Sequence, residues 1–519
     1  MKYYLTPQAF SLLIIAFVIF GIFWCLLRKP PSMKITVSPE TTHITSPLRV
    51  DGTVNFTAAL NEKLAAQTTR EDNLIAGLFS LVRSPEILTG DPEKDVKYRE
   101  RFWAKLGFDA PPAEESLHAV SPPKELREAW DKVCEGEIET LLEFPILTDW
   151  VSSTDDFTRQ LLEVSRLPGY YHPLLGMDGE EDVLLTDVNL VSYGMNLMTV
   201  TQFLRIRGNW DFLHGRHDQA VECALASIRM GQTMRKGAGT YIEEIVGLGI
   251  SGIGKTQLRA YLTYPAMNAV PREWMLQKKQ EFETLCPPYG VYSEIPTWFF
   301  GERLFGLQSV SKDSSEMFET LQQEDRRTAG VVKFYKNIGR FDDDAVMRQM
   351  NRIYDAWGEI LLEPEYPRQA TAVKRLESSV VAMKLESVEQ RVGCIMMESW
   401  GGIRTIVECY HRQEMARRVT ILAFALAAWR VNHDGENPDS LEQLVPEYLN
   451  QVPCVPATET PMRYVKRERE CLITADDSYK LDGSETEIEE EISRTNAGSL
   501  IYPELGAEAG IIYVMWKNR

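Results

Sequence analysis

The stretch YIEEIVGLGISGIGKTQLRAYL, residues 241–262, decides between two possible folds for this chain. Within it, Gly249–Thr256 matches the pattern G-x-x-x-x-G-K-[ST] of a phosphate-binding loop, in which Lys255 would reach the phosphates of a nucleotide. Such a loop joins a buried strand to a helix whose first backbone N–H groups face the phosphates. A protein built around this loop would be an α/β protein with alternating strands and helices.

The apolar pattern of the same stretch predicts a helix instead. Glu243 and Glu244 occupy positions at which a buried strand needs apolar side chains. Apolar residues recur at helical spacing through the whole pattern, and the glycines would then allow close packing between helices. We therefore expect a helix over residues 241–261, and nucleotide binding at Gly249–Thr256 is the least favoured of the functions considered.

The segments on both sides of this stretch also have helical periodicity. Two amphipathic helices, one over residues 187–212 and one ending near Arg235, are joined by a turn with Gly215 and Ala220. This turn resembles a single tetratricopeptide-type hairpin, but no second copy follows at a 34-residue period. Further helices are expected over residues 54–66, 69–81, 124–142, 272–285, 341–362, 368–397 and 404–430. The sequence thus predicts a large α-helical body over residues 48–435.

In the C-terminal part, the spacing of apolar residues changes from a helical period to the alternation of strands. The helix over residues 404–430 should end at His433-Asp434-Gly435, because glycine is favoured just after a helix. Alternating patterns then predict strands over residues 462–465, 471–474 and 511–514. We expect residues 436–519 to form a small α+β domain, in which the glutamate-rich run 485–491 is a solvated loop.

The N-terminal stretch Phe10–Leu27, FSLLIIAFVIFGIFWCLL, is uncharged and just long enough to cross a bilayer. Bulky residues at 22–24 do not fit the small-residue site at which a signal peptide is cleaved. The sequence therefore predicts a retained, single-pass transmembrane helix, a signal-anchor, within residues 1–28. Residues 29–47, rich in Pro, Ser and Thr, are predicted to be a linker.

Charge and cysteine content limit the partners of the soluble part. Acidic residues outnumber basic ones by 75 to 56, giving a net charge of −19, which disfavours nucleic acid and anionic lipid surfaces. The eight cysteines form no C-x-x-C pair, so zinc-knuckle and thioredoxin spacings are absent. In an oxidising compartment, Cys454 and Cys471 are the pair that we would expect to form a disulfide.

The possible metal-binding groups are each incomplete. His214, His217 and Asp218 lie in one short segment. Because a turn is expected there, a solvated loop is favoured over a metal site. Cys409 and His411 lack a third ligand. Asp476, Asp477, Asp482 and the run 485–491 lack the fixed spacing of an EF-hand loop. We assign no catalytic, cofactor-binding or metal-ligating residue from the sequence.

Several short stretches along the chain carry a family resemblance. They are Pro47-Leu48, residues 51–61, residues 69–73, residues 170–174 and the hairpin around Gly215 and Ala220. Together they resemble a family of uncharacterised, membrane-anchored helical proteins of planctomycete-type bacteria, in which the stretch matching Gly249–Thr256 resembles a small-residue helix. The charges flanking the anchor, Lys2 against Arg28 and Lys29, are nearly balanced. The resemblance implies an N-terminus inside the cell and the bulk of the chain on the periplasmic or extracytoplasmic side.

A second resemblance covers residues of about 415–475. The segment ALAAWRVNHDGENPDSLEQLVPEYL, residues 425–449, resembles the helix, turn and short helix that lead into a small sheet in type II secretion major pseudopilins. The N-terminal segment lacks the prepilin processing site, and no Asp-rich calcium loop is evident in residues 502–510. The resemblance therefore implies a similar local fold more than a role in pilus-like assembly.

The sequence leaves three hypotheses for the function of this protein. The favoured one is a non-enzymatic protein of the bacterial cell envelope, attached to the membrane through Phe10–Leu27, whose helical surface binds protein partners of unknown identity. The alternative is an exported hydrolase with an unrecognised carboxylate site in a loop such as Ser152–Asp156. The third is the nucleotide-binding protein considered above. We expect no cofactor and no nucleic-acid partner.

Overall fold

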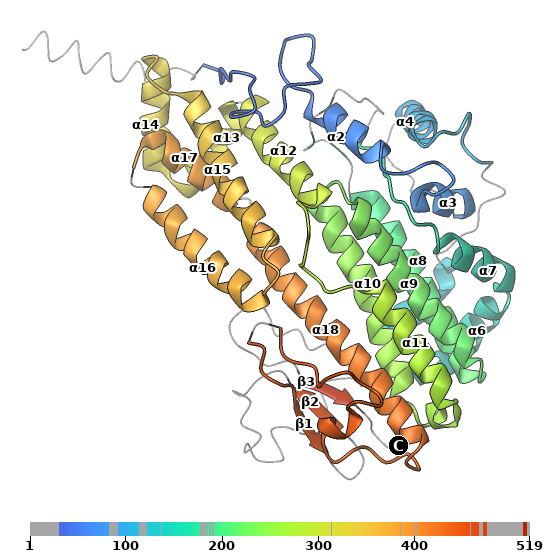
Figure 1. Ribbon diagram of the computed structural model, residues 1–519. Coiled ribbons are helices and arrows are strands. Elements are labelled where there is room, and N and C mark those ends of the chain that lie inside the picture. Colours follow the sequence, from blue (N-terminus) through green and yellow to red (C-terminus); the bar gives the residue numbers. More distant parts are fainter. Residues whose placement is uncertain are drawn as a thin grey trace, which may run out of the picture.

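The computed structural model describes residues 31–82, 92–113, 122–135, 138–176, 183, 185, 188, 191–312, 314–384, 386–399, 402–456, 458–466, 471–474 and 512–515. Over these residues the protein is mainly α-helical, which confirms that part of the predicted fold class, and a small sheet lies at one end (Figure 1). The predicted anchor Phe10–Leu27 and the run 485–491 lie outside the described residues. Of the helices described, none is both long enough and apolar enough to cross a membrane.

Three long antiparallel helices form the centre of the body (Figure 1). They are α8 (Val191–Leu213), α9 (His217–Gly237) and α10 (Tyr241–Leu262). Gly215 in the turn between α8 and α9 has a φ of 75°, a conformation that favours glycine. The helix predicted over residues 241–261 is thus confirmed, and it runs unbroken through the phosphate-loop pattern.

The start of α10 explains the two glutamates that argue against a strand. The Thr240 hydroxyl accepts a hydrogen bond from the backbone N–H of Glu243 (3.3 Å) and caps the helix. The Glu243 carboxylate in turn accepts one from the backbone N–H of Gly239 (2.8 Å). This arrangement is similar to a capping box, except that the carboxylate accepts from the residue before the N-cap. The Thr240 hydroxyl satisfies one of the N–H groups that a helix start leaves without partners.

Small residues allow α9 and α10 to approach closely. A Cβ atom on Gly231 would lie 2.5 Å from the carbonyl oxygen of Gly247, and one on Gly254 would lie 2.6 Å from that of Ala224. Gly249, by contrast, has nothing within 4 Å of its Cβ position. One glycine of the pattern therefore serves helix packing, as predicted, and the other faces open space.

Helices α11 (Arg272–Leu285) and α18 (Gly402–Val431) pack against each other, and α18 also packs against α10. The apolar run of α18, residues 421–428, is buried, as its composition predicts. The helix ends where predicted, since Asp434 and Gly435 have positive φ and the N–H of Gly435 donates to the carbonyl of Arg430 (2.9 Å).

The C-terminal sheet lies beside the end of α18 (Figure 1). Its strands β1 (Arg463–Lys466), β2 (Cys471–Thr474) and β3 (Ile512–Met515) are antiparallel, in the order β1-β2-β3. They match the three predicted strands to within one residue at each end. Cys471 and Ile473 of β2 are buried in the same apolar cluster as residues of α9, α10, α11 and α18. The sheet and the helical body therefore share a hydrophobic core.

The suspected disulfide between Cys454 and Cys471 is wrong, because neither cysteine forms a disulfide in the structure. Cys471 is buried in the core beneath β2, and the thiol of Cys454 lies close to the carbonyl of Val452 (3.9 Å). The disulfide was expected because the two cysteines flank a short β unit. In the structure, Cys471 is buried and Cys454 is only partly buried.

The end of the body opposite the sheet is a second group of helices (Figure 1). They are α12 (Thr297–Lys312), α13 (Ser314–Glu324), α14 (Arg326–Asn337), α15 (Asp343–Leu361), α16 (Tyr366–Met383) and α17 (Val388–Ser399). The single helix predicted over residues 368–397 is in fact α16 and α17. The hydroxyl of Ser387 accepts from the N–H of Gln390 (3.1 Å) and so starts a new helix.

Smaller helices precede α8 in the chain. They are α2 (Phe56–Ala65), α3 (Leu74–Leu81), α4 (Pro92–Lys105), α5 (Arg127–Glu135), α6 (Pro145–Ser152) and α7 (Asp155–Val164), with short 3-10 turns η2 (Lys124–Leu126) and η3 (Ile138–Glu143). Of these, α3, α5, α6 and α7 pack against α8 or α9. The helix predicted over residues 124–142 is therefore divided. The helix predicted over residues 69–81 begins only at Leu74, because the Asn73 side chain accepts from the N–H of Ile75 (3.1 Å) and caps α3.

The described part of the predicted linker is bound to the helical body. The backbone N–H groups of Lys34 and Thr36 donate to the carboxylates of Asp343 and Asp344, each at 2.8 Å. The side-chain amide of Asn351 donates to the carbonyls of residues 40 and 41 at 2.9 Å. We call residues 31–44 the N-terminal strap, which lies along the start and middle of α15.

The glycine contacts allow a matched test of the helical interpretation. Gly254→Ala should lower the free energy of unfolding by about 1–3 kcal/mol, because its methyl group would collide with α9. Gly249→Ala should be neutral or stabilise by about 0.5–1 kcal/mol, because alanine is the better helix former and the site is open. Urea unfolding of both variants measures this. Equal destabilisation by both would contradict the packing described for α10.

Candidate functional site

Lys255, the residue that a phosphate-binding loop would use, is wholly buried on α10. Its ammonium donates to the hydroxyl of Tyr289 (2.9 Å) and to the side-chain carbonyl of Gln413 on α18. The same tyrosine oxygen lies 2.9 Å from the hydroxyl of Ser251 and accepts from the amide of Gln232 on α9 (2.5 Å). The Tyr289 hydroxyl thus links the segment after α11 to α9 and α10. Lys255 extends this link to α18 through Gln413.

A buried ion pair lies beside this group. Arg235 of α9 donates to the carboxylate of Glu244 on α10 (2.7 Å), and the Tyr410 hydroxyl on α18 donates to the same carboxylate oxygen (2.9 Å). The Tyr292 hydroxyl donates to that of Tyr410 (2.8 Å). The Arg235 guanidinium also lies 4.5 Å from the centre of the Tyr289 ring, which connects the pair to the lysine group.

A third set of charges holds the segment between α11 and α12. Glu414 of α18 accepts from the backbone N–H of Tyr289 (3.2 Å) and from the guanidinium groups of Arg417 (3.1 Å) and Arg418 (2.7 Å). Gly290 has a φ of 70°. We call these three sets the interior polar cluster, whose members are Gln232, Arg235, Glu244, Ser251, Lys255, Tyr289, Tyr292, Tyr410, Gln413, Glu414, Arg417 and Arg418.

The cluster contains groups that could in principle do acid–base chemistry. Burial lowers the pKa of the Lys255 ammonium to about 7, because the charged form loses its hydration. The chain Ser251–Tyr289–Lys255 is one through which a proton could be shared. All three side chains are completely buried, however, and their polar atoms bond to one another and to α9 and α18. The arrangement joins helices.

The geometry of a phosphate-binding loop is not formed at Gly249–Thr256. These residues lie in the middle of α10, where backbone N–H groups are used in the helix itself and none can surround a phosphate. The helical interpretation, based on the apolar spacing and on Glu243 and Glu244, is the correct one.

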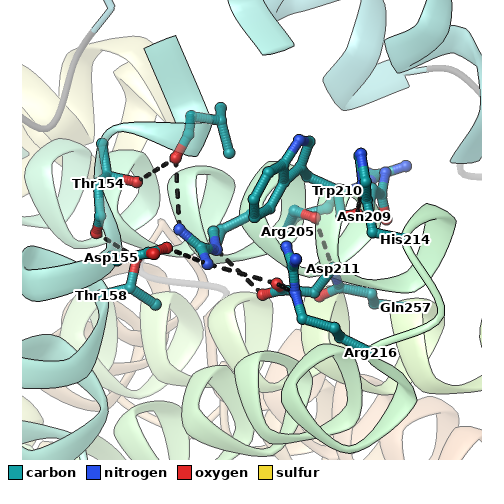
Figure 2. A network of polar contacts seen from close by, with 12 residues as sticks. Thr154, Asp155, Thr158, Arg205, Asn209, Trp210, Asp211, His214, Arg216 and Gln257 are labelled. Carbon is teal, nitrogen blue, oxygen red and sulfur yellow. Dashed lines mark hydrogen bonds and ion pairs between the residues drawn. The ribbon is translucent and has the colours of Figure 1, made fainter. Parts of the chain in front are cut away.

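A second polar network lies under the turn between α8 and α9, and Figure 2 shows it. The buried guanidinium of Arg207 on α8 donates to Asp211 (3.0 Å) and forms an ion pair with Asp155 of α7 (2.6 Å). Arg216 in the turn also pairs with Asp211 (2.7 Å). The Trp210 ring lies 4.6 Å from the Arg207 guanidinium and 4.0 Å from that of Arg216, so it stacks between two cations.

This network includes the loop in which a hydrolase site was considered. Asp155 of Ser152–Asp156 contacts Arg207 (Figure 2), while Asp156 pairs with Arg159 on the same helix (3.0 Å). The Ser152 hydroxyl donates to the backbone carbonyl of residue 149 (2.8 Å). The carboxylates of this loop are thus each engaged with an arginine.

The histidines of the hairpin turn are separated from one another. His214 stacks on Trp210 and hydrogen-bonds to its backbone carbonyl (2.7 Å), whereas the His217 ring lies against Phe212. Asp218 accepts from the indole of Trp274 (3.1 Å). Within the part of the chain that the structure describes, no three His, Cys, Asp or Glu side chains are gathered as a metal site would need.

The other residues considered as metal ligands are Cys409 with His411 and the aspartates at 476, 477 and 482. His411 lies 3.4 Å from the amide oxygen of Gln369, and Cys409 is a half-buried free thiol. Asp476, Asp477 and Asp482 lie outside the described residues. Sequence reasoning did not find the interior polar cluster. Its one visible signal is the pair Glu243-Glu244 within an apolar helical stripe, which indicates buried carboxylates that need partners.

Comparisons with protein-family models, with curated proteins and with solved structures found no match to this chain. The two resemblances described from the sequence therefore remain predictions.

The pKa of Lys255 gives a pH test of the cluster. Lysine in an unfolded chain titrates near 10.4, so between about pH 7 and 10 the unfolded state binds more protons than the folded state, and the folded state gains stability as pH rises. The variant Lys255→Met lacks this contribution to the pH dependence of the unfolding free energy. The unfolding free energy of the wild type should rise relative to the variant by up to about 1.4 kcal/mol per pH unit in this window. Urea unfolding from about pH 6 to 9 measures it, and parallel curves for the two proteins would disprove it.

The Arg207 network allows a second comparison. Arg207→Met removes a partner of the buried Asp211 and should cost about 3 kcal/mol of unfolding free energy. Asp155→Asn removes the partner whose side chain is 75% exposed and should cost less than about 1 kcal/mol. Thermal and urea unfolding give both values. If the asparagine variant is the more damaging, then Asp155 has a role that ion pairing does not explain.

Proposed function

We propose that this protein is anchored in a membrane by Phe10–Leu27, with its body on the extracytoplasmic side, and that the helical body binds other proteins without carrying out a reaction. The apolar length of Phe10–Leu27 supports the anchor. The proposal that the body carries out no reaction is supported by its reactive side chains, which bond to neighbouring helices. Lys255, Tyr289 and Asp155 all hold helices to their neighbours.

The observation that carries the binding role is an exposed apolar pair on the outer side of the body. Leu142 of η3 is 58% exposed and Ile146 of α6 is 70% exposed. Their neighbours Leu141 and Leu147 are completely buried, which fixes the outward direction of the pair. Helix α6 lies at the outer edge of the molecule, on the side away from α14 and α16 (Figure 1). Two large apolar side chains held in water suit contact with another protein surface.

The double variant Leu142→Asp with Ile146→Asp tests this role. It should fold with an unfolding free energy within about 0.5 kcal/mol of the wild type, because both side chains are exposed, and it should lose the complex that the wild type forms. Native electrophoresis of membranes solubilised in mild detergent measures the complex. The matched control is Val381→Asp on α16, which is 60% exposed.

Retention of a complex of unchanged size in the double variant would contradict the role given to this pair. The anchor is tested separately, by extraction of the membranes at alkaline pH, which should leave the chain in the pellet. Digestion of the body by protease once only the outer barrier is opened would support the proposed orientation.

A further inference from the structure

The surface of α14 differs in charge from the rest of this acidic chain. Residues 326–341, RRTAGVVKFYKNIGRF, contain five cationic side chains and no carboxylate, in a chain whose net charge is −19. Residue Lys336 is buried and pairs with Asp343 (2.8 Å). Among the described residues, no carboxylate lies within ion-pair distance of the other four, which are Arg326, Arg327, Lys333 and Arg340.

The outer face of α14 is also apolar and unpartnered. The helix buries Thr328, Ala329, Val332 and Lys336 on one side. The opposite side carries Arg327, Val331, Phe334 and Ile338, which follow one another at helical spacing. Val331 and Ile338 are each 40% exposed. Cations beside apolar and aromatic side chains on one helix face are typical of a helix that lies in a membrane interface.

The aspartates that flank α14 are engaged with other groups. Asp325 caps the helix and accepts from the backbone N–H groups of Arg327 and Thr328, each at 3.1 Å. Asp342 caps α15 and pairs with Arg348 (3.0 Å), and Asp344 accepts from the backbone N–H of Thr36 (2.8 Å). Asp343 is shared by Lys336 and the N–H of Lys34. The α14 cations are therefore not neutralised by the acidic segment that follows them.

The position of the N-terminal strap places the C-terminal half of α14 near the predicted anchor. The Lys336 ammonium donates to the carbonyl of Pro31 (3.5 Å). Pro31 lies four positions after Leu27, the end of the apolar stretch, and four residue steps span at most about 14 Å. The headgroup layer is about 5–7 Å thick on each side of the hydrocarbon. Since α14 is about 18 Å long, its C-terminal half lies within reach of the lipid headgroups.

We propose that the outer face of α14, formed by Arg327, Val331, Phe334 and Ile338 with Lys333 and Arg340 beside it, lies on the membrane next to the anchor and binds anionic lipid headgroups. This inference rests on the proposed anchor. The net charge of the chain disfavours such a surface only at long range, because salt screens charges beyond about 8–10 Å. At contact, the four local cations decide the interaction.

Photo-cross-linking of the full-length chain in lipid nanodiscs tests this binding. A benzophenone amino acid replaces Val331 or Ile338, with Ile146 as an exposed control at the far side of the body and Phe20 as a control within the anchor. In nanodiscs with about 30% phosphatidylglycerol, positions 331 and 338 should capture lipid at least about fivefold more than position 146. The yield should fall in nanodiscs of phosphatidylcholine alone.

A pair of charge variants separates headgroup binding from mere proximity. Lys333→Gln with Arg340→Gln should abolish the increase that phosphatidylglycerol causes. Lys374→Gln with Arg375→Gln, which removes two exposed cations from α16, should leave it unchanged.

The outcomes distinguish the inference from the anchor on which it depends. Lipid capture at position 20 without capture above control at 331 and 338 overturns the role of α14 and keeps the anchor. No capture at 20, together with release of the chain at alkaline pH, overturns the anchor and this inference with it. Capture of a protein in place of lipid at 331 and 338 in native membranes also overturns the inference.

Discussion

An ion pair inside the helical body, between Arg235 of α9 and Glu244 of α10, constrains how the central helices lie together. Withdrawing both charges from water costs several kcal/mol per ion, so such a pair persists only where further groups satisfy it. Here Tyr410 of α18 donates to the carboxylate, and aromatic rings lie against the guanidinium. These partners come from elements far apart in sequence, so the pair fixes α18 against the α9–α10 hairpin. Because the sheet lies at the end of α18 and shares its core, the placement of that helix also sets the position of the C-terminal region.

The same cluster shows why reactive residue types do not by themselves indicate a reaction. The lowered pKa of Lys255 follows from its burial, as it would for any lysine removed from water. Its partners Tyr289 and Gln413 come from the segment after α11 and from α18, so the amine works as a connector between elements. Asp155 has a comparable role at the other network, where it attaches α7 to Arg207 of α8. In both places a polar group satisfies a buried charge and orders the surrounding helices.

Much of the fold could be predicted from periodicity, because long amphipathic helices and alternating strands have strong local patterns. Helices α8 to α11, α15 and α18 and the three strands follow this rule. Boundaries set by a single capping side chain were missed, as at Asn73 and Ser387. The interior polar cluster could not be predicted, since its contacts join residues such as Glu244 and Tyr410, 166 positions apart. Helix α14 was not among the helices predicted from the sequence, although one of its sides is buried.

Net charge, which is a property of the whole sequence, hides how charge is arranged after folding. The −19 of the chain suggests a body repelled by anionic surfaces, yet residues 326–341 carry four cations that form no ion pair with a described carboxylate. The backbone N–H groups of the N-terminal strap occupy the carboxylates of Asp343 and Asp344. Binding of the strap to α15 brings the chain that leaves the predicted anchor to α14. The same contacts engage two of the carboxylates that follow α14 in the sequence, so one set of contacts determines both the position of the strap and the partners of these carboxylates.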